Sequence, residues 1–206
     1  TIKRHASELL GRQETQSLVD KFKESNPKVI EELIPDVLSL GKIQKVLQNL
    51  LKEHVSIRDL RTILEQLADY APSTQDTDVL TEYVRQAMAR PITKQFQSAD
   101  GSLSVMTLDR QVEEIIQKSI QRTEVNSFLA LEPTIAEKLL VELQGAVEAM
   151  SPQMETSPVL LASPGIRHHL RKFLERFIPD LAVLSHSEII PSVQIKTLKV
   201  VNLNAN

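Results

Sequence analysis

Hydrophobic residues recur at intervals of three and four along the first half of the chain, which is the spacing of one face of an α-helix. The clearest stripe follows Ser39 and comprises Leu40, Ile43, Val46, Leu47, Leu50 and Leu51. A second stripe ends near Ala71 and Pro72 and comprises Ile57, Leu60, Ile63, Leu64 and Leu67. We predict two amphipathic helices joined by a turn of about three residues at 54–56, which together form a helix-turn-helix element.

Residues that favour helix starts precede both stripes. Ser39 is the expected N-cap of the first helix and Ser56 that of the second, with Asp59 three residues later as a short-armed capping box. We expect a core shared by the two helices at Leu47, Leu50, Leu60 and Leu64. Shorter helices are predicted at residues 2–10, 13–23, 28–33 and, after a cap at Asp76 or Thr77, up to Pro91; residues 92–96 are expected to be extended.

The pattern changes after Asp100-Gly101, a turn signal, because strand-like and helical segments alternate from Leu103 onward. Strands are expected at 103–108, 159–162, 181–185 and 193–201, the last at an edge or antiparallel, and helices at 109–120, 133–147 and 164–177. A strand, a helix and a second buried strand form a parallel unit with a right-handed crossover. The predicted fold is mixed α and α/β: a helical, winged-helix-like subdomain at 1–97 and a small α/β subdomain with a partly parallel sheet at 98–206.

Composition narrows the functional classes. The 206 residues are 41% hydrophobic, enough for a packed core, but only 3% aromatic, which gives no base-stacking platform. Twenty-four basic and 27 acidic residues give a net charge of −3, which argues against a nucleic-acid or polyphosphate binder. Cysteine is absent, so there is neither a disulfide framework nor a thiolate metal site. Apolar runs are far shorter than the roughly 18 residues of a membrane helix, so we expect no span.

Four segments carry a resemblance to a known family. The run VLQNLLKEHVSIRDLRTILEQLADYAP at 46–72 resembles the signature segment of the FHIPEP family of type III secretion export-gate proteins, and is most similar to the flagellar member. HASELLGRQETQSLVDKF at 5–22 and LTEYVRQAMARPITKQF at 80–96 agree in order and spacing. PVLLASPGIRHHLRKFLERFIPDLAVLSHSEI at 158–189 is similar to the last cytoplasmic subdomain of the family, more loosely.

The resemblance implies a function without chemistry. Proteins of this family have a membrane-embedded N-terminal half and a cytoplasmic C-terminal half, so we interpret this chain, which begins at Thr1, as a soluble piece of the latter at the cytoplasmic face of the bacterial inner membrane. The resemblance implies a ring of identical subunits that receives export substrates with their chaperones and communicates with the export ATPase complex. An injectisome homologue of the flagellar protein is an alternative, because it shares the fold.

Two groups of basic residues are candidate contact sites. Arg58 and Arg61 stand three apart at the start of the second stripe, so they are neighbours on a helix, and we expect them to pair with carboxylates across a subunit contact. Their other interpretation is a solvated helix face. The helix after Ser163 carries a second group that is either solvated or a surface for an acidic partner: Arg167, Arg171, Lys172 and Arg176.

Other constellations predict little chemistry. Adjacent residues His168 and His169 point about 100° apart on a helix and lack a third ligand at matching spacing, so no metal site is expected. Ser163-Pro164-Gly165 resembles a phosphate-binding turn, but one glycine without GxxxxGK[ST] or GxGxxG favours a plain strand-to-helix turn. No GxSxG nucleophile setting occurs, and we expect neither catalysis nor a cofactor. A winged-helix transcription regulator with an α/β sensing domain is the other functional alternative, although acidic residues line the second helix.

Overall fold

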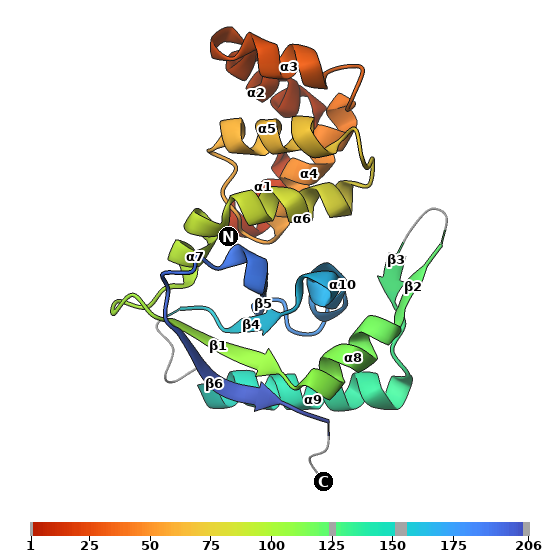
Figure 1. The fold of residues 1–206 in the computed structure, drawn as a ribbon, viewed down its shortest axis with the longest axis vertical. Coiled ribbons are helices and arrows are strands. Elements are labelled where there is room, and N and C mark those ends of the chain that lie inside the picture. The colour runs from red at the N-terminus through yellow and green to blue at the C-terminus, as the bar shows by residue number, and fades with distance from the viewer. Residues whose placement is uncertain (1, 124–126, 151–155, 204–206) are drawn as a thin grey trace. The chain divides into compact units, whose positions relative to one another are not determined.

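The computed structural model describes residues 2–123, 127–150 and 156–203 (Figure 1). The chain forms two compact units, residues 1–92 and residues 93–206. Every element that lies wholly within the described part of the first unit is a helix, whereas the second unit combines helices with a parallel sheet. The mixed α and α/β class predicted from the sequence is therefore confirmed.

The first unit is built from helices that pack in pairs: α1 (Ile2–Leu9), α2 (Arg12–Ser25), α3 (Pro27–Leu33), α4 (Leu40–Lys52), α5 (Leu60–Tyr70) and α6 (Thr77–Ala87). Helix α4 packs against α1 and α6, and α5 packs against α3 and α6. The expected stripe of α4 and most of that of α5 form the core, in which Leu47, Leu50 and Leu64 are fully buried. An ion pair joins the end of α4 to α6, where Nη1 of the buried Arg85 is 3.4 Å from Oε2 of Glu53.

Helix α5 begins three residues later than predicted. Its N-cap is Asp59, whose Oδ1 accepts from the Thr62 amide at 3.1 Å, whereas the Ser56 hydroxyl accepts only from the Arg58 amide. The connection from α4 is consequently longer than a three-residue turn: His54 adopts a positive φ of 59° and the Val55 side chain is buried. Because Leu60 now opens the helix instead of lying a turn inside it, its side chain is half-exposed, and the expectation of a core position was wrong.

Helix α7 (Ala89–Phe96) corrects a second expectation, because residues 92–96 are helical and not extended. Pro91 is the third residue of this helix, within the first turn, where the missing N–H has no intrahelical partner to lose. The boundary between the two compact units falls inside α7, after Ile92. Thr93 belongs to the second unit: its hydroxyl donates to the Glu188 carbonyl at 3.0 Å and accepts from the Ile190 amide at 3.2 Å.

The second unit contains a four-stranded parallel sheet with the order β5-β4-β1-β6. Its strands are β1 (Leu103–Leu108), β4 (Val159–Ala162), β5 (Ala182–Ser185) and β6 (Ile195–Val201). The connections contain α8 (Arg110–Lys118), α9 (Pro133–Met150), α10 (Pro164–Leu174) and the 3-10 helix η2 (His186–Glu188). The last strand lies at the edge of the sheet as expected, but it runs parallel to β1, not antiparallel.

A short antiparallel hairpin interrupts the crossover between β1 and β4. It pairs β2 (Ile120–Arg122) with β3 (Ser127–Leu129), so Ile120 opens a strand and does not continue helix α8 as the apolar spacing had predicted. Phe177 differs from its prediction as well, because α10 ends at Leu174 and the Phe177 side chain is 50% exposed. Both expectations extended an apolar spacing beyond the true end of a helix.

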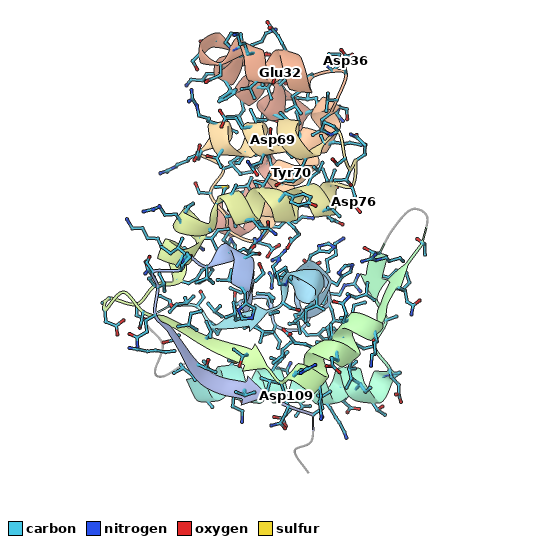
Figure 2. The ribbon with its side chains drawn as sticks, in the orientation of Figure 1. Glu32, Asp36, Asp69, Tyr70, Asp76 and Asp109 are labelled. Atoms are coloured by element: carbon cyan, nitrogen blue, oxygen red, sulfur yellow. The ribbon has the colours of Figure 1, made fainter. Side chains whose placement is uncertain are left out.

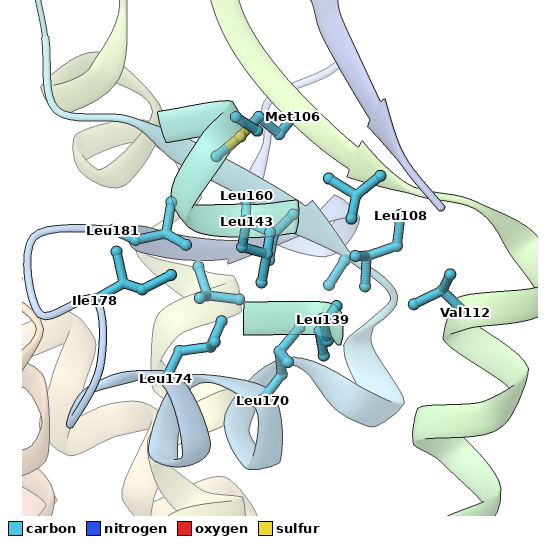
Figure 3. Packing of buried hydrophobic residues seen from close by; sticks show 14 of the residues in the cluster. Met106, Leu108, Val112, Leu139, Leu143, Leu160, Leu170, Leu174, Ile178 and Leu181 are labelled. Carbon is cyan, nitrogen blue, oxygen red and sulfur yellow. The ribbon is translucent and has the colours of Figure 1, made fainter. Parts of the chain in front are cut away.

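The core of the second unit joins the sheet to all three long helices. Met106 and Leu160 of the sheet pack with Leu139 and Leu143 of α9 and with Leu170 of α10 (Figure 3). Asp109 caps α8 by accepting from the Gln111 amide at 2.9 Å, as predicted. The helices therefore hold the sheet through aliphatic contacts, in keeping with the small number of aromatic residues in the chain.

Edge strand β6 is irregular and contains two lysines. Its register against β1 shifts between Val105 and Met106, which leaves Leu198 as an extra residue in a bulge. Lys196 forms an ion pair with Asp100 in the turn before β1, with 2.7 Å between Nζ and Oδ2. The Lys196 ammonium, followed by the hydroxyl and amide of Ser102, holds the pKa of the Asp100 carboxyl well below its usual range.

Candidate functional site

Among the described residues, neither a cluster of metal-ion ligands nor a membrane-spanning helix occurs. Within residues 2–123, 127–150 and 156–203, no three His, Asp or Glu side chains gather where they could hold a metal ion. No helix in that part of the chain is both long enough and apolar enough to span a bilayer. We therefore built the candidate site from the two basic groups and from the exposed aromatic residues.

Arg58 and Arg61 have different surroundings, although both side chains are exposed. Arg61 lies in the first turn of α5 and donates from Nη2 to Asn26 Oδ1, so it ties α5 to the residue that precedes α3. Arg58 lies in the connection before α5, and its guanidinium forms no hydrogen bond with another described residue. Arg58 is thus the better placed of the two for an intersubunit contact, which stays a prediction for both.

The predicted basic group is not one continuous surface, and Arg176 lies two residues beyond the end of α10. Arg167 is only 1% exposed, and its Nη1 donates to the Val183 carbonyl of β5 at 3.1 Å, so this arginine is part of the core and cannot meet a partner. Arg171 donates to the carbonyls of Leu181 and Pro179 at 2.9 and 3.3 Å. Lys172 and Arg176 remain exposed. The sequence could have predicted the burial of Arg167, because this residue precedes Leu170 by three positions and therefore borders the apolar face of the helix.

His168 and His169 of α10 contact each other, and His169 also contacts the hairpin. Their rings meet edge to face with centroids 4.6 Å apart. His169 Nε2 lies 2.8 Å from the Ser127 hydroxyl and so connects α10 to strand β3 of the hairpin. This contact gives His169 a structural role, the positioning of the hairpin.

The turn at Ser163-Pro164-Gly165 already holds a carboxylate of the chain itself. The Ser163 amide donates to Glu113 Oε1 at 2.8 Å, and the Ser163 side chain makes no capping hydrogen bond. A Cβ atom on Gly165 would lie 2.9 Å from Oε1 of Gln117, the flexible end of an α8 side chain, so α8 covers this turn. These contacts favour the plain strand-to-helix turn over a phosphate site.

The sequence analysis missed one surface feature of the first unit. Tyr70 at the end of α5 stacks on Tyr83 of α6, with ring centroids 3.9 Å apart and planes 5° from parallel. Tyr70 is 37% exposed, and the nearby α6 residue Val79 is 39% exposed. In Figure 2 Tyr70 lies between the α5 and α6 ribbons, with Asp69 on α5 beside it. The two tyrosines are 13 positions apart in sequence, so only the packing of α5 on α6 reveals the pair.

Comparisons with known proteins agree over nearly the whole chain. The FHIPEP family model matches residues 1–194. The chain is 48% identical over 202 residues to the flagellar biosynthesis protein FlhA of Bacillus subtilis, covering 98% of this chain and 30% of that protein. The chain thus spans less than a third of the length of this curated relative.

Solved structures of related proteins share the fold. The protein of the Chlamydia pneumoniae CdsV and CdsO complex that matches this chain has a TM-score of 0.90 at 34% identity, covering 98% of this chain and 58% of that one. The nonameric EPEC SctV-C has a TM-score of 0.87 at 32% identity, covering 97% and 60%.

Proposed function

Because this chain belongs to the FHIPEP family, we propose that it forms part of the cytoplasmic docking platform of a flagellar type III protein-export gate. In this role it receives export substrates with their chaperones and couples them to the export ATPase complex, without acting on them chemically. The observation that carries the proposal is the 48% identity to the flagellar relative over 98% of the chain. The injectisome alternative has weaker support, since the two solved injectisome-type relatives described above are 32% and 34% identical.

A segment exchange tests the flagellar assignment. Residues 1–206 replace the matching segment of the Bacillus subtilis protein, and swimming motility and secreted flagellar proteins are measured. We expect the exchange to restore both in a strain that lacks its own protein. The matched control carries the corresponding segment of EPEC SctV-C and should restore neither. If the control works and this chain does not, at equal protein levels, the injectisome alternative is the correct one.

The alternative of a transcription regulator has a separate test. Helix α5 would be the reading helix, but its exposed positions include Glu65 and Asp69, which repel phosphates. We expect no mobility shift of nonspecific duplex DNA at low salt, where an electrostatic contribution would be largest. A salt-dependent shift would favour the regulator.

We further propose that the protein works as a ring of identical subunits and that Arg58 takes part in the subunit contact. The nonameric state of SctV-C supports the ring. Arg58→Glu should leave the fold intact, because exposed charges contribute only about 0 to 1 kcal/mol, yet it should weaken ring assembly and motility. Arg61→Glu should in addition loosen α5 from Asn26. Normal rings in both variants would return the two arginines to an ordinary solvated face.

We propose that Lys172 in the last turn of α10 and Arg176 just after it contact an acidic protein partner. The export ATPase complex is one such partner. The solved complex of CdsV with CdsO supports a protein partner, because CdsV is a relative of this chain. Of the predicted basic group, only Lys172 and Arg176 have exposed side chains. Reversing both to Glu should weaken capture of the ATPase complex. Lys138→Glu with Lys199→Glu, which makes the same change of charge at other exposed positions, should not.

A further inference from the structure

Both tyrosines of the chain are used in one exposed stack. The chain has two Tyr and no Trp, so the Tyr70–Tyr83 pair is its whole complement of large amphipathic aromatic side chains. Tyrosine at the surface supplies a rigid contact area with few rotatable bonds, and such residues carry much of the binding free energy in protein interfaces. A stacked pair that is still more than one-third exposed at Tyr70 is therefore preorganised for a partner.

The charges along α5 indicate the chemistry of that partner. Arg58 and Arg61 lie at the positive end of the helix dipole, and Asp69 lies in the last turn at the negative end. Apart from the cap at Asp59, the first turn of α5 contains no acidic residue and its last turn contains no basic one, so its terminal charges do not interact favourably with the helix dipole. Helix stability does not explain this layout. It does, however, give the exposed side of α5 a basic start and an acidic, aromatic end.

A ring of identical chains requires this kind of asymmetry. A head-to-tail contact brings two different patches together, and each subunit must carry both. We propose that the Tyr70–Tyr83 stack together with Asp69 is the surface that receives Arg58 of the next copy of this chain. The inference rests on the ring proposed above and supplies the missing half of the contact. A guanidinium has the chemistry for this surface, because it can pair with a carboxylate and can also lie on an aromatic ring.

The absence of cysteine allows a direct test by cross-linking. Arg58→Cys and Asp69→Cys are combined in one chain and assembled under mild oxidation. Arg58 lies before α5 and Asp69 lies in its last turn. Leu60 and Asp69 alone are about 14 Å apart along the helix, at 1.5 Å per residue, whereas a disulfide needs Cα atoms within about 7 Å. Any bond between them therefore joins two chains. We expect a ladder of covalent multimers, whereas Arg58→Cys with Glu137→Cys, which uses an exposed residue of α9, should stop at random dimers.

Charge exchange provides the second test. Arg58→Glu and Asp69→Arg alone should each raise the concentration needed for half assembly by at least about tenfold. The double variant places Glu at 58 opposite Arg at 69, so the attraction between subunits returns with the charges exchanged. Its concentration for half assembly should lie close to that of the parent protein. The tyrosine fluorescence of the parent protein reports on the same surface without a label, and it should change on assembly in proportion to the ring fraction.

The outcomes separate the inference from the function on which it rests. Rings without the ladder and without recovery in the double variant overturn the inference and leave the ring in place. No assembly of the parent protein overturns both. A change in tyrosine fluorescence that occurs only when a different protein is added assigns the surface to that protein and overturns the inference as well.

Discussion

Two leucines of α5 that satisfy the same apolar spacing have different environments. Leu64 is fully buried, whereas Leu60 is half-exposed at the helix start. We expect Leu64→Ala to lower the free energy of unfolding by about 2 to 5 kcal/mol, because it leaves a cavity in the core. Leu60→Ala should cost less than about 1.5 kcal/mol, since only part of its side chain is withdrawn from water. Urea unfolding of the two variants gives both values; equal losses would contradict the burial of Leu64.

Burial also decides what a charge contributes. Arg85 is 1% exposed and faces Glu53, whereas the Arg110–Glu114 pair of α8 lies at the surface. Glu53→Gln should cost about 3 kcal/mol, because it removes an opposite charge beside a guanidinium that is 1% exposed. Glu114→Gln is the matched control and should cost less than about 0.5 kcal/mol. Thermal unfolding that is identical for both variants would show that the buried pair has no net effect.

At the scale of whole elements, the start of α5 tests how a helix chooses its cap. Asp59 accepts from both the amide and the hydroxyl of Thr62. Asp59→Ala should therefore cost about 0.5 to 2 kcal/mol, the usual effect of losing a cap. Ser56→Ala should remain within about 0.5 kcal/mol, because Ser56 lies outside the helix. Denaturant unfolding measures both variants. A larger loss of unfolding free energy in Ser56→Ala than in Asp59→Ala would indicate that α5 begins at Ser56, as the sequence predicted.

The same helix shows what sequence patterns could and could not determine. Period and cap type identified nearly every helix and all four strands of the sheet, because those signals are local. They could not choose between Ser56 and Asp59, since both residues can cap and the choice depends on the backbone of His54 and the burial of Val55. A period of two also fixes the faces of a strand and not its direction, which left β6 undetermined.

The candidate surfaces were less predictable than the fold. Charge alone grouped Arg167 with its exposed neighbours, although it donates to the Val183 carbonyl in the core. The pairing of Tyr70 with Tyr83 requires knowledge that α5 packs on α6. Hairpin β2–β3 was missed because strands of three residues are too short for a periodic signal. Each of these features depends on contacts between residues distant in sequence.

For the molecule as a whole, the limit between the two units has a measurable consequence. The sequence predicted a division at 97/98, and Thr93 nevertheless bonds Glu188 and Ile190 inside the second unit. A fragment of residues 89–206 should therefore unfold at a higher temperature than one of residues 98–206, which leaves buried polar groups without their partner. If the shorter fragment is equally stable, the division at 97/98 is adequate.

The bulge at Leu198 has a consequence for solubility. A regular outer strand presents a row of free amides and carbonyls that another chain can extend, which is how sheets grow into aggregates. In β6 the bulge breaks that row, and two lysines flank it at positions 196 and 199, so exposed Ile195, Leu198 and Val200 do not form an even template. The bulge thus discourages further strand pairing at this edge of the sheet, which matters most where many copies of one chain are held close together.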